Sequence, residues 1–179
     1  MDYPAYVFGF GGIAHSTLAF FYVATKRNWK YLYLLGHLCI VSTMFIRIDD
    51  KFVHSLTSTI LGSIGHGLLL LFSILYPTPN VLMNTVFTIG QAGMIVNYVR
   101  DYLYTNKNKA LNIISVITFG LMCMFYLIKT VSIFGEGNIG LALGSLLVSI
   151  VYILFIINES IVIADNESGD EFPIFQRNR

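Results

Sequence analysis

Residues 137–158 read GNIGLALGSLLVSIVYILFIIN and contain no charged side chain. A helix needs about 20 mainly apolar residues to cross a bilayer, so this stretch is long enough to span one. Five further apolar stretches precede it, separated by short polar segments such as TNKNK at residues 105–109. The six predicted spans cover most of the chain: Tyr6–Thr25, Tyr31–Arg47, His54–Tyr76, Val81–Tyr104, Ala110–Lys129 and Gly137–Asn158.

The composition agrees with a chain that lies largely in lipid. Hydrophobic residues make up 55% of the 179 residues and charged residues only 12%, against about 25% charged residues in globular domains. A soluble core of this size could not bury so much apolar surface. We therefore predict an all-α fold, a polytopic membrane helix bundle of about six transmembrane helices. It occupies residues 1–160, and residues 161–179 form a polar tail.

A weak internal repeat accompanies these spans. Residues 25–28 resemble residues 105–108, eighty positions later, and the pair Met44-Phe45 recurs as Met124-Phe125 at the same offset. If the repeat is real, each half holds three helices, and an odd number would invert the second half in the membrane, as in some transporters. Chance similarity between apolar segments is the alternative.

The net charge and the two cysteines argue against some classes of function. A net charge of +1 without a basic block argues against nucleic acid binding. Cys39 and Cys123 lie in separate predicted spans and form neither a CxxC motif nor a disulfide framework. We expect membrane lipids as partners, with a homo-oligomer or a larger membrane complex left open. An integral membrane location is expected, and an endomembrane is favoured.

Three histidines fall inside the predicted spans, where ionisable residues are functional candidates by default. With a rise of 1.5 Å per residue, His15, His37 and His66 lie roughly 9–15 Å from the same membrane face. Gln91 and Ser149 reach similar depths in the fourth and sixth spans. The sequence thus predicts a polar layer as the candidate ligand-binding site: His15, His37, His66, Gln91 and Ser149.

Three interpretations of this polar layer stay open. Each histidine can simply bond a neighbouring carbonyl, since buried polar groups normally find partners. The layer can instead line a cavity that binds a lipid headgroup or a small solute. A zinc site of three imidazoles is the third, but the chain has no His-x₃-His or Glu-x-x-His pair. We expect no metal and no cofactor, and we assign no catalytic residue.

Carboxylates are nearly absent from the spans. Asp101 follows Arg100 near the end of the fourth span, and Glu159 ends the sixth. We expect Arg100 and Asp101 to interact with water or with each other at the interface. Acid–base chemistry inside the membrane would then depend on histidine.

Three stretches resemble the lysoplasmalogenase family of multi-helix membrane enzymes, which cleave the vinyl-ether bond of lysoplasmalogens. Residues 60–66, ILGSIGH, are similar to a small-residue helix of that family that ends in Gly-Asp. Residues 144–158 resemble its Gly-Ala-Leu-Phe helix, and residues 29–38 the stretch that carries its Lys and Pro. The family's first Asp aligns with His66, its second falls near Tyr152, and its Lys-Pro pair is replaced at Gly36-His37.

The resemblance implies a role in lipid chemistry, either as an enzyme or as a non-catalytic relative. We therefore expect a multi-pass membrane protein with an intramembrane polar pocket that binds or processes a lipid or lysolipid. An enzyme of this kind would be a lysoplasmalogenase-like hydrolase. Two alternatives remain: a small transporter with inverted repeats, and a structural subunit of a membrane complex without a site.

Overall fold

The computed structural model describes residues 5–24, 30–49, 53–103 and 109–168, and this part of the chain contains six α-helices and no strand. The predicted all-α fold is therefore confirmed. The helices are α1 Ala5–Val23, α2 Lys30–Ile46, α3 Leu56–Leu75, α4 Val81–Leu103, α5 Lys109–Gly135 and α6 Ile139–Ser168.

Polar side chains start three of these helices by accepting bonds from free backbone N–H groups, among them Asn80 at the start of α4. The Ser55 side chain accepts from the Ser58 N–H at 3.1 Å at the start of α3. Asn138 Oδ1 accepts from the Leu141 N–H at 3.2 Å at the start of α6. Because the first turn of a helix leaves its N–H groups without intrahelical partners, such caps fix where the helix begins.

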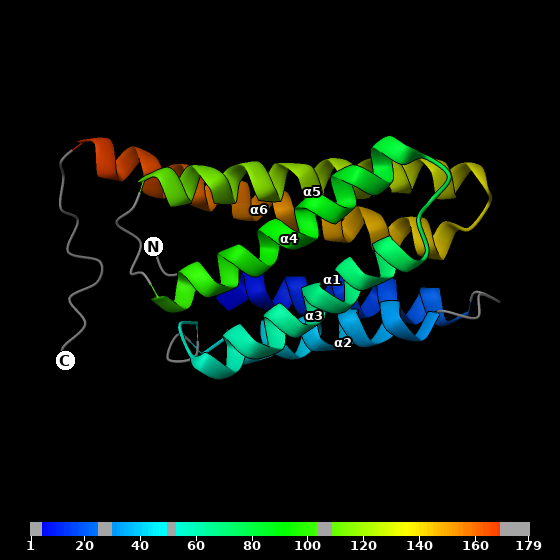
Figure 1. The fold of residues 1–179 in the computed structure, drawn as a ribbon, viewed down its shortest axis with the longest axis horizontal. Helices are drawn as coiled ribbons and strands as arrows, with labels where there is room; N and C mark the ends of the chain where they lie inside the picture. The colour runs from blue at the N-terminus through cyan, green and yellow to red at the C-terminus, as the bar shows by residue number, and fades with distance from the viewer. Residues whose placement is uncertain (1–4, 25–29, 50–52, 104–108, 169–179) are drawn as a thin grey trace.

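The six helices form a closed ring. Each helix packs on its neighbours in the chain, and α1 also packs on α6. In Figure 1, α5 and α6 lie along one side, α1, α2 and α3 lie along the other, and α4 crosses diagonally between them. Side chains from all six helices therefore meet in one interior.

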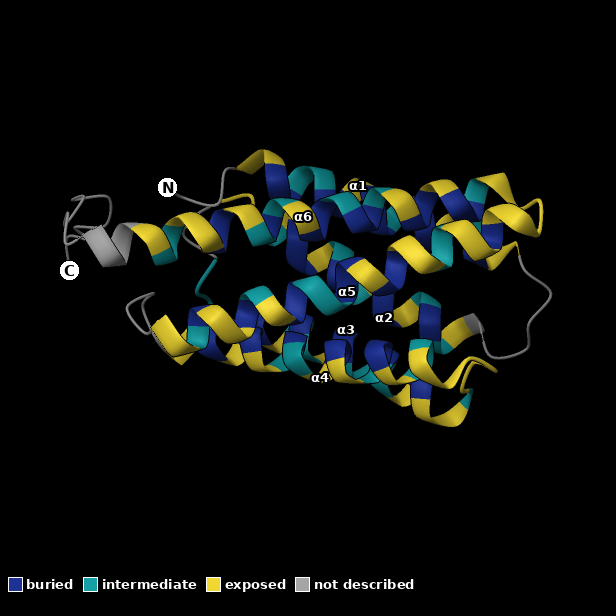
Figure 2. Ribbon diagram, turned by 90° about the horizontal axis from the view of Figure 1, so that it is seen from above, coloured by how far each residue is buried: buried dark blue, intermediate teal, exposed yellow. Residues whose placement is uncertain are grey.

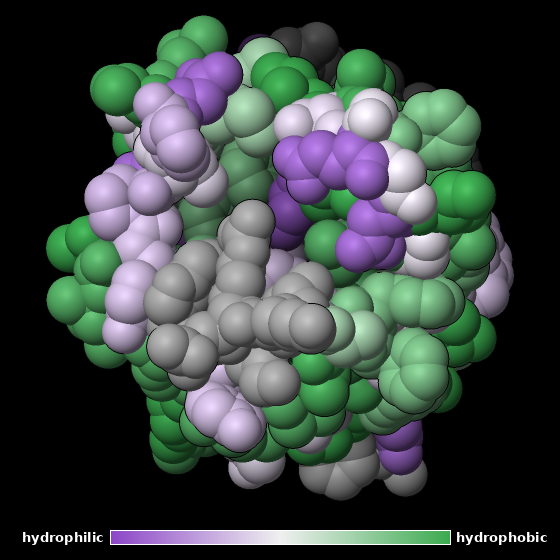
Figure 3. Space-filling view, turned by 90° about the vertical axis from the view of Figure 1, so that its right-hand side faces the viewer, coloured by the Kyte–Doolittle hydropathy of each residue, from purple (hydrophilic) through white to green (hydrophobic). Residues whose placement is uncertain are grey.

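The outer surface of the ring is apolar. Large hydrophobic side chains such as Phe20, Ile117 and Val131 are exposed on it, and Figure 2 shows exposed residues along the outer faces of the helices. Figure 3 views the end with the α5–α6 turn, where hydrophobic residues form the flanks and hydrophilic residues gather on the end face. Such an apolar surface needs lipid around it.

Helix lengths support the same conclusion. Among the described residues, four helices are long and apolar enough to cross a membrane, namely α1, α3, α5 and α6, and α2 is a shorter apolar helix. The remaining helix, α4, has 23 residues, and it turns Gln91, Asn97 and Arg100 into the interior, where all three are buried. These three polar residues therefore do not face lipid.

Two helices extend beyond their predicted ends. The α5 helix continues from Lys129 to Gly135, and α6 continues from Asn158 to Ser168. The turn between them is short because Gly137 takes a positive φ of 79°, which glycine adopts without strain. The predicted boundary at residue 160 thus lies within α6, and residues 169–179 lie outside the described part of the chain.

Candidate functional site

All five residues of the predicted polar layer lie in the interior, and none of them has measurable exposure. They come from five helices: His15 from α1, His37 from α2, His66 from α3, Gln91 from α4 and Ser149 from α6. The structure joins four of them into two hydrogen-bonded pairs.

The first pair joins α1 to α2. His15 Nδ1 and His37 Nδ1 lie 2.9 Å apart. A neutral imidazole has one N–H donor and one acceptor nitrogen, so one ring donates here and the other accepts. The outer nitrogens then differ: one Nε2 is an acceptor and the other carries a hydrogen. Neither of these Nε2 atoms has a hydrogen-bond partner in the structure.

The second pair joins α3 to α4. His66 Nδ1 lies 2.7 Å from Gln91 Oε1. Since an amide oxygen only accepts, His66 Nδ1 carries the hydrogen, and Nε2 of the neutral ring has a free lone pair. This Nε2 atom is buried and has no hydrogen-bond partner. The His66 ring also lies within electrostatic reach of His15 and His37.

Ser149 does not join either pair. Its hydroxyl donates to the Leu146 carbonyl within the same helix, at 2.7 Å. One turn further along α6, Tyr152 meets His15 edge to face with ring centroids 6.4 Å apart. The sixth helix therefore contacts the histidine layer through Tyr152, a residue that the depth argument did not select.

The three histidines do not form a metal centre. Across the described ranges, no group of three His, Cys, Asp or Glu side chains is placed to hold a metal ion. His15 and His37 bond each other, and His66 bonds Gln91 instead. The zinc alternative therefore has no geometric support.

Sequence reasoning missed a buried charge network at the end of the bundle where α4 ends and α5 begins. Arg100 is only 6% exposed and bonds the Glu159 carboxylate at 3.0 Å and the Asp101 carboxylate at 2.7 Å. It also donates to Asn112 and Ser115 on α5. The predicted contact between Arg100 and Asp101 is confirmed, and Glu159, which lies at the end of the sixth predicted span, is also buried, with 3% exposure.

A second arginine extends this network to α2 and α3. Arg47 donates to Asp101 Oδ2 at 3.0 Å and to Ser58 Oγ at 3.4 Å. Its guanidinium group lies 4.4 Å from the centre of the Tyr98 ring, a cation–π contact. The signal for this network was present in the sequence, because successive antiparallel helices bring Arg47, Asp101 and Glu159 to the same end of the bundle.

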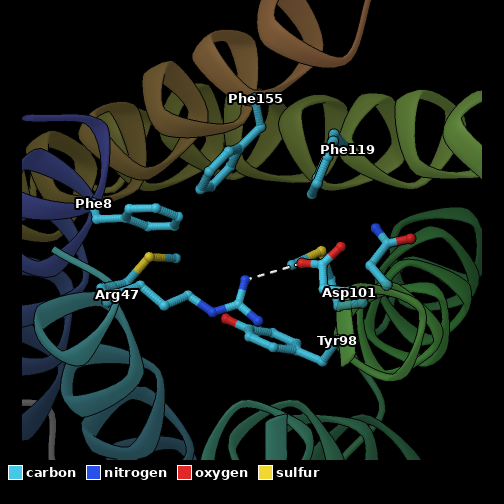
Figure 4. A pocket seen from close by; sticks show the side chains of 9 residues that line it. Phe8, Arg47, Tyr98, Asp101, Phe119 and Phe155 are labelled. Atoms are coloured by element: carbon cyan, nitrogen blue, oxygen red, sulfur yellow. Dashed lines mark hydrogen bonds and ion pairs between the residues drawn. The ribbon is translucent and has the colours of Figure 1, made fainter. Parts of the chain in front are cut away.

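A small cavity of about 20 Å³ lies beside the network. Figure 4 shows Arg47, Tyr98 and Asp101 on one side of it and three phenylalanine rings on the other. The lining residues are Phe8, Met44, Arg47, Met94, Asn97, Tyr98, Asp101, Phe119 and Phe155. By position along the helices, the cavity lies between the charge network and the histidine layer.

The opposite end of the bundle has a different polar contact. Lys129 on α5 donates to the Tyr33 hydroxyl at 2.9 Å and lies 4.7 Å from the centre of the same ring. The Tyr33 ring in turn lies 4.3 Å from the His37 ring. Tyr33 thus contacts both His37 of the polar layer and Lys129 at this end of the bundle.

These features define the chain as a multi-pass helical membrane protein with a polar interior. Comparison with known protein families, with curated proteins and with solved structures gave no match to this chain.

Proposed function

We propose that this protein binds the polar part of a lipid or lysolipid inside its helix bundle, as a lysoplasmalogenase-like hydrolase or as a non-catalytic relative. The observation that carries the proposal is the set of three buried Nε2 atoms, on His15, His37 and His66, without hydrogen-bond partners. Because buried polar groups are normally bonded, these atoms are available to a ligand.

The chemistry of the three nitrogens fits a hydroxyl-bearing headgroup. The His15–His37 pair offers one donor and one acceptor, and a hydroxyl group can bond to both kinds of nitrogen. His66 offers a further acceptor. A lysolipid carries a free glycerol hydroxyl, which distinguishes it from a lipid with two acyl chains.

An apolar groove supports a lipid as the ligand. It has a volume of about 230 Å³ and lies on the α4 and α5 side of the bundle, lined by Ile95, Val96, Val99, Arg100 and Leu111. Four of its five lining residues carry hydrocarbon side chains, and the fifth, Arg100, belongs to the charge network. A groove of this composition suits the acyl chain of a lipid that approaches from the bilayer.

In the enzyme version of the proposal, His66 is the general base. Its free Nε2 lone pair takes a proton from the attacking water, whose oxygen bonds the vinyl carbon next to the ether oxygen, and the ring gives that proton to the other vinyl carbon. The hemiacetal formed then breaks down to the fatty aldehyde and the glycerol hydroxyl. His66 is also the residue that aligns with the first acidic residue of the lysoplasmalogenase family. The non-catalytic version keeps the same contacts but requires no proton transfer.

The experiment is lipid binding and hydrolysis with the purified protein in detergent. Lysolipid binding is measured by native mass spectrometry, and lysoplasmalogen hydrolysis by release of the fatty aldehyde. We expect His66→Ala to weaken lysolipid binding about tenfold through loss of one buried hydrogen bond. His54→Ala is the matched control, because His54 bonds the Asp101 carbonyl outside the layer.

The possible results separate the two versions. Turnover that disappears in His66→Ala supports the enzyme, whereas binding without turnover supports the non-catalytic relative. Absence of lysolipid binding in the wild-type protein would overturn the proposal as a whole.

A further inference from the structure

The small cavity beside the charge network contains a hydrogen-bond donor on Arg47 that the protein does not use. Arg47 is 5% exposed. Its Nη1 atom donates to Asp101 and its Nε atom to Ser58, and its Nη2 atom has no hydrogen-bond partner. Because Arg47 lines the cavity, this N–H group is available to whatever occupies it.

A second donor comes from Asn97, whose side-chain oxygen faces Ser115. Arg100 donates to Ser115 Oγ, and Ser115 donates to Asn97 Oδ1 at 2.8 Å. With its oxygen bonded on that side, Asn97 is left with its Nδ2 amide group, which is buried and has no hydrogen-bond partner. Asn97 lines the same cavity, which therefore holds two unused donors.

The charge balance decides which kind of acceptor fits. The network contains two arginines, Arg47 and Arg100, and two carboxylates, Asp101 and Glu159, joined by three ion pairs. An added anion would lie beside the Asp101 carboxylate, which lines the same cavity away from water, and such a contact between like charges is strongly unfavourable. The two donors therefore suit an uncharged oxygen.

The size and the lining of the cavity further restrict which group of a ligand can fit. About 20 Å³ is room for one oxygen-sized group. Three phenylalanine rings form part of the wall, and the flexible side chains of Met44 and Met94 also line it. Methionine adapts its shape readily, so these two side chains can make room for the carbon atoms next to the oxygen.

From these observations we infer that the cavity is a subsite for the uncharged carbonyl oxygen of an acyl lipid, bonded by Asn97 Nδ2 and Arg47 Nη2. The inference rests on the non-catalytic version of the proposed function and narrows it, because it favours acyl lipids over ether lipids as the occupant, and a lysoplasmalogen has a vinyl ether in place of an acyl carbonyl. A water molecule satisfies the same two donors, so the experiment must separate the two occupants.

Two neutral probes differ mainly in the carbonyl group: 1-monooleoylglycerol, an ester, and 1-O-oleylglycerol, the corresponding ether. Binding of each to the full chain in detergent is measured by native mass spectrometry. We expect the wild-type protein to bind the ester about tenfold more tightly, as one additional hydrogen bond to a buried donor allows.

Two variants test the donors separately. Asn97→Leu keeps the approximate size of the side chain and removes the free donor without adding a charge. Arg47→Lys keeps a positive charge beside Asp101 but removes Nη2. We expect each variant to bind ester and ether about equally. Asn138→Leu is the matched control, since Asn138 is an exposed helix cap far along the chain from the cavity, and it should keep the preference.

The outcomes distinguish this inference from the proposed function. Equal binding of ester and ether by the wild-type protein overturns the carbonyl subsite, as expected if water alone fills the cavity, and leaves lipid binding standing. A preference that persists in both Asn97→Leu and Arg47→Lys also overturns it. Absence of binding by either probe overturns both proposals. Thermal unfolding of each variant establishes that it is folded.

Discussion

Gly36 and Gly65 face each other where α2 packs on α3. A Cβ atom on Gly65 would lie 2.9 Å from the Gly36 carbonyl oxygen, and one on Gly36 would lie 3.0 Å from the Gly65 carbonyl oxygen. Small residues allow this close approach of helices in lipid. Each glycine directly precedes a histidine of the polar layer, so this contact positions His37 and His66.

Gly65→Ala should destabilise the protein. The added methyl group would meet backbone of α2, which cannot move away as a flexible side chain can, and we expect a loss of about 1–3 kcal/mol in the free energy of unfolding. Gly67→Ala is the matched control, because a Cβ atom there meets nothing within 4 Å. Thermal unfolding in detergent measures both, and equal stabilities would contradict the proposed helix contact.

The hydrogen bond between His15 and His37 should contribute to stability. His15→Ala leaves His37 Nδ1 buried without its partner, and such a loss costs about 1–3 kcal/mol. His15→Asn offers an amide group near the position of Nδ1 and should recover part of this loss. A double-mutant cycle with His37→Ala measures the coupling, which should be at least about 0.5 kcal/mol for residues in contact.

Glu159→Gln should destabilise the end of the bundle that holds the charge network. Arg100 then keeps only the Asp101 carboxylate, and we expect a loss of about 1–3 kcal/mol for a charged, buried hydrogen-bonded pair. Glu136→Gln is the control because Glu136 is exposed at the α5–α6 turn. Chemical unfolding in mixed micelles measures the difference, and two variants of equal stability would contradict a structural role for Glu159.

Tyr33→Phe should weaken the contact between α2 and α5. The substitution removes the oxygen that accepts from Lys129 but keeps the ring beneath its ammonium group. We expect a loss of about 0.5–1.5 kcal/mol, the usual contribution of one hydrogen bond. Tyr6→Phe, at an exposed position of α1, should have no such effect on the unfolding temperature.

The sequence predicted the helices well because lipid imposes a strong and simple pattern. Apolar runs of about 20 residues mark spans directly, and the start of α4 at Val81 was predicted at the observed residue. The far ends of α5 and α6 were predicted less well. Both helices continue past the predicted interface, where hydropathy falls but helical hydrogen bonding does not stop.

The candidate site was predictable only in part. The five residues chosen by depth along the spans are all buried in the structure, but depth alone does not specify which way a side chain faces around the helix. The pairing of His66 with Gln91 and the self-contained hydroxyl of Ser149 depend on that rotation. Glu159 was missed because its interior partner, Arg100, lies 59 positions away in the sequence.

The closure of the ring by α1 and α6 has a consequence for symmetry. The six antiparallel helices follow one another around a cylinder. Viewed from the end of the bundle where α1 starts, α1 to α3 follow one another in one rotational direction. Viewed from the opposite end, where α4 starts, α4 to α6 follow one another in the other direction. Two units of opposite handedness cannot be superposed by rotation. The ring order of the described helices therefore differs from the order that an inverted duplication of two three-helix halves would produce. The matching tetrapeptides at residues 25–28 and 105–108 lie outside the described residues.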